Sequence, residues 1–275
     1  MTITTVALFL LLGCFSGFFA GLLGVGGGMI IVPFLTAIFS LYHLVPPEYI
    51  VHIAIATAMG TIVFTSLSSM RAHHKRGGVI WSIVLQITPG ILIGGLLSGS
   101  VIFQWLNTAW LSFVFSLFVF YSGFNMLRNK KPKPSRQLPG MIGMTSVGII
   151  IGLISGLVGA GGGFLSVPFM VWSNVPLKKA VSTSAAIGFP IAVANSIGYI
   201  IGGIQTLGIH GHLFGYIYWP GLLVLILMSI LFAPMGAKYA HILPVDKLKK
   251  IFACLLFLIS ILMMHKALVE FGLLN

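Results

Sequence analysis

The chain has 275 residues, of which 58% are hydrophobic and only 7% are charged. So few charged side chains cannot cover a water-soluble domain of this size, and the composition excludes that class. The net charge of +12 does not indicate nucleic-acid binding, because the Lys and Arg residues lie between apolar blocks and not on one face. Many of these blocks approach the length of about 20 residues that a bilayer-spanning helix needs. The sequence therefore predicts an all-α polytopic membrane protein in contact with the lipid bilayer, since a helix satisfies its own backbone hydrogen bonds in lipid.

Two sets of five apolar segments follow each other along the chain. The first set is expected near residues 4–23, 28–42, 49–70, 79–102 and 107–127. The second set is expected near residues 140–158, 163–174, 180–206, 214–237 and 246–266. The second segment of each set is too short to span a bilayer comfortably, so we expect eight to ten membrane helices, some of them short or broken. Proline and charge in the stretch 128–136 predict a solvated loop between the sets. The predicted domains are a first membrane repeat at 1–127, a basic cytoplasmic linker at 128–139 and a second membrane repeat at 140–275.

The two sets share a glycine-rich sequence. Residues 13–34 read GCFSGFFAGLLGVGGGMIIVPF, and residues 148–169 read GIIIGLISGLVGAGGGFLSVPF, with eleven of the 22 positions identical. Because the shared register includes Val-Pro-Phe as well as glycine, it indicates duplication of one unit.

Basic residues predict the orientation of the two copies. Fourteen of the 15 Lys and Arg residues fall in the stretches 71–76, 128–136, 178–179 and 238–250. With one pass for each segment, all four stretches lie on the same side of the bilayer, which the positive-inside rule makes the cytoplasm. Five segments is an odd number, so the copies would have opposite orientation, as in transporters built from inverted repeats. We expect a multi-pass protein of the cell (inner) membrane with both termini extracytoplasmic.

A glycine stripe precedes the densest glycine run in each copy. Gly13, Gly17 and Gly21 recur at four-residue spacing, as do their counterparts in the second copy. This spacing lets another helix backbone approach closely, and it indicates packing rather than ligand binding.

The dense glycine runs predict breaks in the helices. They consist of Gly24, Gly26, Gly27 and Gly28 in the first copy, and Gly159, Gly161, Gly162 and Gly163 in the second. Each glycine costs about 1 kcal/mol in a helix interior relative to alanine, so the helix should end there and a new one begin. The start of a helix presents backbone N–H groups and a positive dipole end, which favour an anion. Two breaks that meet in mid-membrane would form a central site for a small anionic substrate.

The positions of the acidic residues also favour an anionic over a cationic substrate. Glu48, Asp246 and Glu270 are the acidic residues of the chain, and all lie at segment ends. No carboxylate is expected in mid-membrane, where a cation carrier would need one. No metal site or cofactor is indicated, and the sequence offers no nucleophile with a base for an intramembrane enzyme.

Hydroxyl and amide side chains follow each glycine break. Those of the third and eighth segments are Thr57, Thr61, Ser66, Ser69, Ser182, Thr183, Ser184, Asn195 and Ser196. Thr57 and Thr183 occupy matching places in the two copies. The candidate substrate-binding residues are therefore the eight glycines of the breaks with Thr57, Thr183, Ser184 and Asn195. A carrier and an anion channel of the same architecture both fit this pattern, and the sequence leaves open whether two chains pair as a homodimer.

The doubled motif resembles that of the TauE/SafE sulfite exporter family. The resemblance rests on GLLGVGGG…VP at 21–33, GLVGAGGG…VP at 156–168, the Thr- and Ser-rich segments that follow, and GAKYAHILPVDKL at 236–248. It covers nearly the whole chain. The resemblance implies transport, with export expected, of sulfite, organosulfonates or another small anion across the cell membrane.

Overall fold

The computed structural model describes residues 2–23, 26–128, 137–239 and 245–274. The elements before the linker are α1 (Ile3–Leu23), α2 (Gly28–Tyr42), η1 (Pro47–Tyr49), α3 (Ile50–His74), α4 (Trp81–Leu97), η2 (Ser98–Ile102), α5 (Phe103–Trp105) and α6 (Thr108–Arg128). Those after it are α7 (Met141–Val158), α8 (Gly163–Trp172), α9 (Leu177–Thr206), β1 (Ile209–His210), β2 (Leu213–Phe214), β3 (Ile217–Tyr218), α10 (Trp219–Tyr239) and α11 (Val245–Glu270). Most of the predicted linker, residues 129–136, lies outside the described residues.

The predicted fold class, an all-α polytopic membrane protein, is confirmed. Within the described residues, eight helices are long and apolar enough to cross a membrane, and α2 and α8 are the two shorter apolar helices. These short helices are the second segments that the sequence marked as too short to span. The division into repeats at 1–127 and 140–275 stays a prediction.

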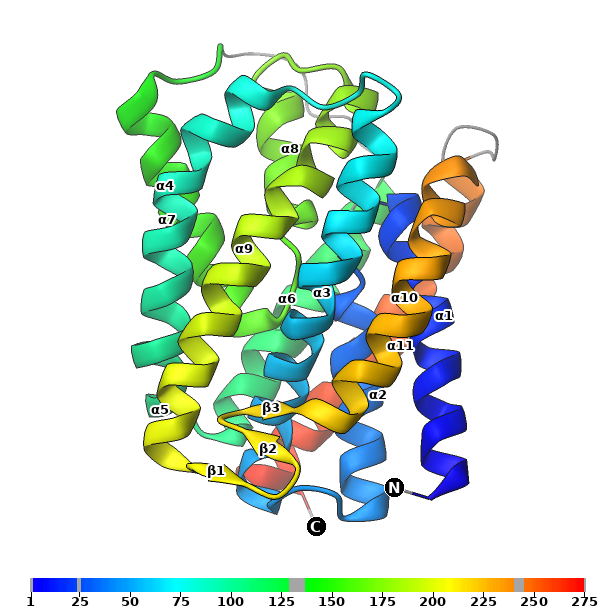
Figure 1. Ribbon diagram of the computed structural model, residues 1–275, viewed down its shortest axis with the longest axis vertical. Coiled ribbons are helices and arrows are strands. Elements are labelled where there is room, and N and C mark those ends of the chain that lie inside the picture. The colour runs from blue at the N-terminus through cyan, green and yellow to red at the C-terminus, as the bar shows by residue number, and fades with distance from the viewer. Residues whose placement is uncertain (1, 24–25, 129–136, 240–244, 275) are drawn as a thin grey trace.

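The elements run in the order that the inverted-repeat prediction requires. The two termini lie at one end of the molecule, here called the terminal end, and α6 ends at the opposite end, here called the linker end (Figure 1). Helix α1 runs towards the linker end and α7 away from it, and the short helices α2 and α8 also run in opposite directions (Figure 1). Basic residues stand in the last turns of α3, α6 and α10, which all finish at the linker end. Which side of the membrane this end faces stays a prediction.

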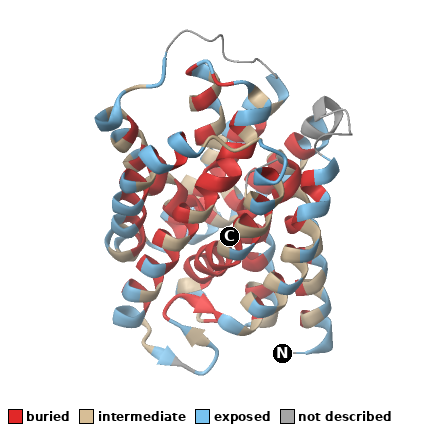
Figure 2. Ribbon diagram, turned by 45° about the horizontal axis from the view of Figure 1, so that its top comes forward, coloured by how far each residue is buried: buried red, intermediate tan, exposed pale blue. Residues whose placement is uncertain are grey.

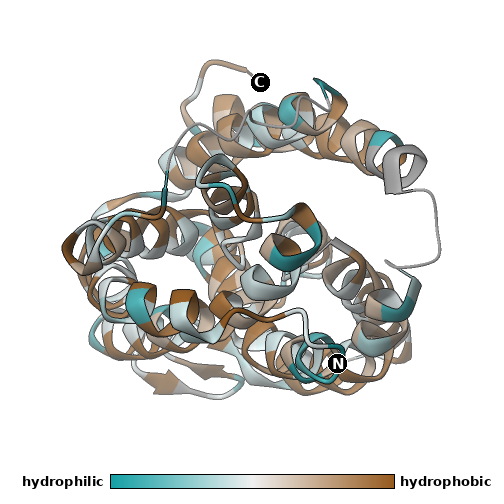
Figure 3. Cartoon of the chain, turned by 90° about the horizontal axis from the view of Figure 1, so that it is seen from above, coloured by the Kyte–Doolittle hydropathy of each residue, from teal (hydrophilic) through white to brown (hydrophobic). Residues whose placement is uncertain are grey.

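Helices α3 and α9 form the centre of the bundle. In the apolar window of α3, 83% of the residues are buried, and 61% in α9, against 50% or less in the other six candidate spans. Buried residues accordingly gather in the middle of the bundle and exposed ones on its outside (Figure 2). The outer helices consist largely of hydrophobic residues (Figure 3), and many of their exposed side chains are large and apolar. A core surrounded by apolar outer faces is what a lipid environment favours.

The region after α9 differs from the prediction. A helical segment was expected from residue 214, but residues 209–218 form a three-stranded antiparallel sheet, and α10 begins only at Trp219. Gly211 and Gly215 lie at the turns with φ of 54° and 60°. This left-handed conformation is readily adopted by glycine and ends helical continuity. Of these two glycines, Gly215 lies inside the segment that was expected to be helical, and Gly211 lies before it.

The glycine stripes join each copy to the other copy's fourth helix. A Cβ atom added at Gly17 would lie 2.6 Å from the Cα atom of Ser229 in α10, and one at Gly21 would overlap the carbonyl oxygen of Ala233. In the second copy, a Cβ at Gly152 would lie 2.7 Å from the carbonyl oxygen of Ile91 in α4. Helix α1 therefore packs on α10, and α7 on α4, at distances that only glycine allows.

Substituting Gly90 tests the closeness of this packing. A Cβ at Gly90 would overlap the carbonyl oxygen of Thr145 in α7, so we expect Gly90→Ala to destabilise the protein by about 1–3 kcal/mol through overpacking. Helix propensity alone would favour alanine by about 1 kcal/mol, so the two effects have opposite signs. The measurement is the thermal unfolding midpoint in detergent. Gly140→Ala is the control, because a Cβ there meets nothing within 4 Å. A midpoint for Gly90→Ala at or above that of the unaltered protein would contradict the packing argument.

Candidate functional site

Each glycine break ends one helix and starts a short one in the same backbone conformation. The N-cap residue of α2 is Gly27, with φ 78° and ψ −10°, and that of α8 is Gly162, with φ 75° and ψ −8°. Both lie in the left-handed region, which a residue with a Cβ adopts only at a cost. In both helices the N-cap carbonyl accepts the first helical bonds, from Ile30 and Ile31 in α2 and from Leu165 and Ser166 in α8. The first N–H groups of each helix have no acceptor within their own helix.

The two breaks touch each other through their backbones. A Cβ added at Gly26 would lie 2.8 Å from the Cα atom of Gly161, its counterpart in the second copy. A Cβ added at Gly28 would overlap the carbonyl oxygen of Gly159. Gly163 is the buried first residue of α8, and Gly24 lies outside the described residues. The structure thus brings the described glycines of both breaks to one place in the bundle.

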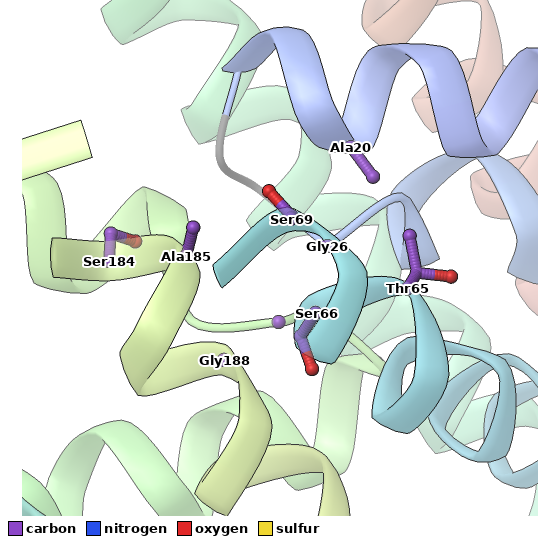
Figure 4. Close-up of a pocket in the computed structure, with 9 residues that line it drawn as sticks. Ala20, Gly26, Thr65, Ser66, Ser69, Ser184, Ala185 and Gly188 are labelled. Atoms are coloured by element: carbon purple, nitrogen blue, oxygen red, sulfur yellow. The ribbon is translucent and has the colours of Figure 1, made fainter. Parts of the chain in front are cut away.

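A small pocket lies beside this contact. Its cavity volume is about 10 Å³, enough for a water-sized group, and the surrounding empty space of about 220 Å³ includes open solvent. Its walls come from α1, α3, α9 and the two breaks, and they consist of Ala20, Gly26, Thr65, Ser66, Ser69, Gly161, Ser184, Ala185 and Gly188 (Figure 4). The residues from α3 belong to its second half, and those from α9 to its first half. Because those halves are the ones towards the linker end, the pocket lies on the linker side of the glycine contact (Figure 1).

The hydroxyl groups of the pocket differ in how they are bonded. Thr65 Oγ1 lies 2.9 Å from the carbonyl oxygen of Thr61 and 2.8 Å from Ser229 Oγ. Ser66 donates to the carbonyl oxygen of Val63, and Ser184 accepts a 2.8 Å bond from Ser166. Ser69 is only 3% exposed, and its Oγ has no hydrogen-bond partner in the described part of the chain. A buried hydroxyl without a partner is costly unless a ligand or water supplies the bond.

Only some of the predicted site residues line this pocket. Gly26, Gly161 and Ser184 do, whereas Thr57, Thr183 and Asn195 lie elsewhere. The amide of Asn195 donates to the carbonyl oxygen of Ile191 at 2.9 Å, within α9.

Thr57 and Thr183 share one structural role. Thr57 Oγ1 accepts the backbone N–H of Tyr218, directly before α10, at 3.0 Å. Thr183 Oγ1 accepts the N–H of Ile80, the N-cap residue of α4, also at 3.0 Å. Each central helix therefore caps the fourth helix of the other copy. The two threonines occupy matching places in the sequence, and both have this packing role.

Sequence reasoning missed several residues of the pocket. Ala20, Thr65, Ala185 and Gly188 were not selected, and Ser66 and Ser69 were noted only as hydroxyl groups of their segment. A signal for two of them is present in the sequence, because Thr57, Thr61, Thr65 and Ser69 recur every four residues and so share one helix face. The small residues of α1 and α9 carry no comparable signal.

Larger side chains occupy the corresponding positions on the other side of the glycine contact. Aligning Thr57 with Thr183 pairs Ala185 with Met59, Gly188 with Ile62, and Ser69 with Asn195. Met59, Ile62 and Asn195 are all 0% exposed. The residues at these positions therefore differ in size, being smaller on the linker side than on the terminal side.

Aromatic rings add to this packing at the terminal end. The ring of His52, at the start of α3, lies 5.0 Å from that of Phe103 and 5.5 Å from that of Tyr216 between the centroids. His52 Nε2 also lies 2.8 Å from the carbonyl oxygen of Leu106. Phe103 in turn contacts Tyr199 at 4.5 Å. These rings link α3, α5 and α9 to one another and to the turn between β2 and β3.

The pocket wall contains neutral groups only. None of its nine residues is ionisable, and the positive contribution comes from the start of α2 beside Gly26. Among the described residues no group of three or more His, Cys, Asp or Glu side chains is placed to hold a metal ion. The arrangement of hydroxyl groups and a helix N-terminus suits a small anion.

Removing the Thr57 hydroxyl tests the reciprocal caps. Thr57→Val keeps the shape of the side chain but leaves the buried N–H of Tyr218 without its acceptor, so we expect a loss of stability of about 1–3 kcal/mol. Thr57→Ser keeps the hydroxyl and is the control. The measurements are the thermal midpoint in detergent and the amide hydrogen exchange of Tyr218. Equal midpoints and equal exchange in the two variants would show that the cap does not stabilise the fold.

Comparison with known proteins agrees with this architecture. The family model described as "Sulfite exporter TauE/SafE" matches residues 9–263. A probable membrane transporter protein of Haemophilus influenzae is 32% identical over 265 residues, which cover 96% of this chain and 99% of the relative. A probable membrane transporter protein of Methanocaldococcus jannaschii is 26% identical and covers 84% of this chain and 85% of the relative. No solved structure matches significantly.

The family match extends from the first spanning helix to the last and includes both glycine breaks. Together with the relative from Haemophilus influenzae, it shows that the chain belongs to the TauE/SafE sulfite exporter family of membrane transporters.

Proposed function

We propose that this transporter exports a small sulfur-containing anion, such as sulfite or an organosulfonate, across the cell membrane by alternating access. The observation that carries the proposal is the pocket at the meeting point of the two glycine breaks, where Ser69 holds a buried hydroxyl without a partner among the described residues. Sulfite and sulfonate oxygens accept hydrogen bonds, and the start of α2 favours negative charge. The family description supports sulfur oxyanions as the substrate class.

The asymmetry about the glycine contact supports a carrier over an open channel. A channel needs a continuous path, whereas on the terminal side the larger residues Met59, Ile62 and Asn195, all fully buried, stand at the positions that match pocket residues. In a protein with inverted repeats, the second state arises when the copies exchange conformations. The exchange would open the terminal side and fill the linker side. The basic residues predict that the linker lies in the cytoplasm. In that orientation the pocket lies on the cytoplasmic side of the glycine contact, where an exporter binds its substrate.

Transport by a Ser69→Ala variant tests the site. Because Ser69 Oγ has no hydrogen-bond partner among the residues that the structure describes, we expect its removal to leave the fold stable, but the anion loses one charge-assisted hydrogen bond worth about 1.5–3 kcal/mol. We expect the KM for sulfite or methanesulfonate to rise about tenfold or more in proteoliposomes, with an unchanged thermal midpoint.

The matched control is Ser196→Ala. Ser196 also holds a buried hydroxyl without a partner, but it does not line the pocket. We expect normal transport from this variant. Equal KM values for Ser69→Ala, Ser196→Ala and the unaltered protein would remove Ser69 from the site.

Cysteine labelling tests alternating access. In a variant with Cys14 and Cys254 replaced by serine, Ala185→Cys places a thiol in the pocket, and Met59→Cys places one at the matching position across the glycine contact. We expect a membrane-impermeant maleimide to label Ala185→Cys from the linker side, with protection by substrate. Met59→Cys should react only from the terminal side. Labelling of both positions from both sides would support a channel and refute the carrier.

A further inference from the structure

The pocket lacks any full positive charge. Its lining consists of glycine, alanine, serine and threonine residues. The histidine nearest to it along α3 is His73, one turn beyond Ser69, and its Nδ1 lies 3.1 Å from Ser182 Oγ. Arg76 contacts the carbonyl oxygen of Ala237 in α10 at 2.6 Å, and Lys178 lies in the first turn of α9. These three residues lie towards the linker end, and none of them lines the pocket.

The start of α2 supplies positive potential instead. Helix α2 has 15 residues and its N-cap residue directly follows Gly26 in the pocket wall. It runs away from the linker end, so its first N–H groups point towards the side on which the pocket lies, whereas α8 runs towards the linker end and its start points away (Figure 1). A helix start is equivalent to about +0.5 elementary charge. The pocket therefore faces about half a positive charge, beside the hydroxyl of Ser69, which has no hydrogen-bond partner among the described residues.

The charge of the ligand decides whether this compensation suffices. The cost of moving an ion out of water grows with the square of its charge, so it rises about fourfold from a monoanion to a dianion of the same size. The attraction to the helix start only doubles. A monoanion leaves about half a charge to be balanced by hydrogen bonds, whereas a dianion leaves about one and a half charges in a buried, neutral wall.

From this balance we propose that the transported species is a monoanion, so that sulfite crosses as hydrogen sulfite and dianions such as sulfate are rejected. The inference rests on the proposed function, because it concerns the same pocket. It assigns selectivity to the small positive charge at the site and not to recognition of sulfur. A small organosulfonate, which carries one negative charge throughout the neutral pH range, satisfies the same condition.

Competition in proteoliposomes containing the full chain tests the proposal. Uptake of radiolabelled methanesulfonate is measured with unlabelled methanesulfonate, sulfate or sulfite as competitor. Methanesulfonate and sulfate are both small and tetrahedral, so they differ mainly in charge. We expect sulfate to compete at least about tenfold more weakly than methanesulfonate, the ratio that corresponds to about one pKa unit of differential interaction. Sulfite should lose most of its competing strength between about pH 6 and about pH 8, as its monoanion is deprotonated.

Two controls separate the ligand's charge from the protein's own titration. Methanesulfonate keeps its charge over this range, so its uptake should change little with pH. His73→Gln, which removes the nearest titratable side chain of α3, should leave the pH dependence of sulfite competition in place. Loss of that dependence in His73→Gln would assign it to the protein and overturn the proposal.

The outcomes distinguish this inference from the function on which it rests. Saturable methanesulfonate uptake with equal competition by sulfate would overturn the monoanion rule and leave the transport function standing. Sulfite competition that does not change with pH would do the same. An absence of saturable uptake of both sulfite and methanesulfonate would refute the proposed function and the monoanion rule together.

Discussion

The two glycine breaks touch each other through their backbones in the middle of the bundle. Gly26 lies against Gly161, and Gly28 against the carbonyl oxygen of Gly159, so no side chain separates the two chain crossings. Backbone that leaves the helical conformation inside a membrane must be buried in protein or line a cavity, because lipid offers no hydrogen bonds. The contact meets this requirement for both breaks, since each is covered by the other and by the central helices α3 and α9.

The remaining helices hold this contact in place by exchanging partners between the copies. The glycine stripes bring α1 onto α10 and α7 onto α4. Thr57 and Thr183 then cap the starts of α10 and α4 from the central helices. Neither copy can keep this packing without the other, because the cap and the stripe partner of each fourth helix both come from the other copy. The fold is for this reason one interlocked unit and not two bundles side by side.

The proposed anion site requires few charged residues. Its positive potential comes from the backbone, at the start of α2, and no Lys or Arg lines the pocket. Such a site holds its dipoles in fixed positions, so no charged side chain has to be desolvated and reordered when a ligand binds.

The sequence alone determined the class of the fold, the breaks and the family. Apolar segments long enough to span lipid predict helices because the bilayer permits little else. Four glycines in five positions predict a break, because each glycine destabilises a helix relative to alanine, whatever the helix packs against. The shortness of α2 and α8 and the packing role of the glycine stripes were readable for the same reason, since they depend on local spacing.

Only the tertiary structure decided which side chains surround the pocket. Ala20, Ala185 and Gly188 carry no chemistry of their own and line it through the way α1 and α9 pack. Thr57 and Thr183 resembled binding residues because they occupy matching positions, yet their hydroxyls bond to backbone N–H groups 161 and 103 residues away. The hydroxyl of Ser69 differs from its neighbours only in having no partner. Which donors are satisfied within the protein and which remain for a ligand depends on contacts between distant segments, and those contacts exist only in the folded bundle.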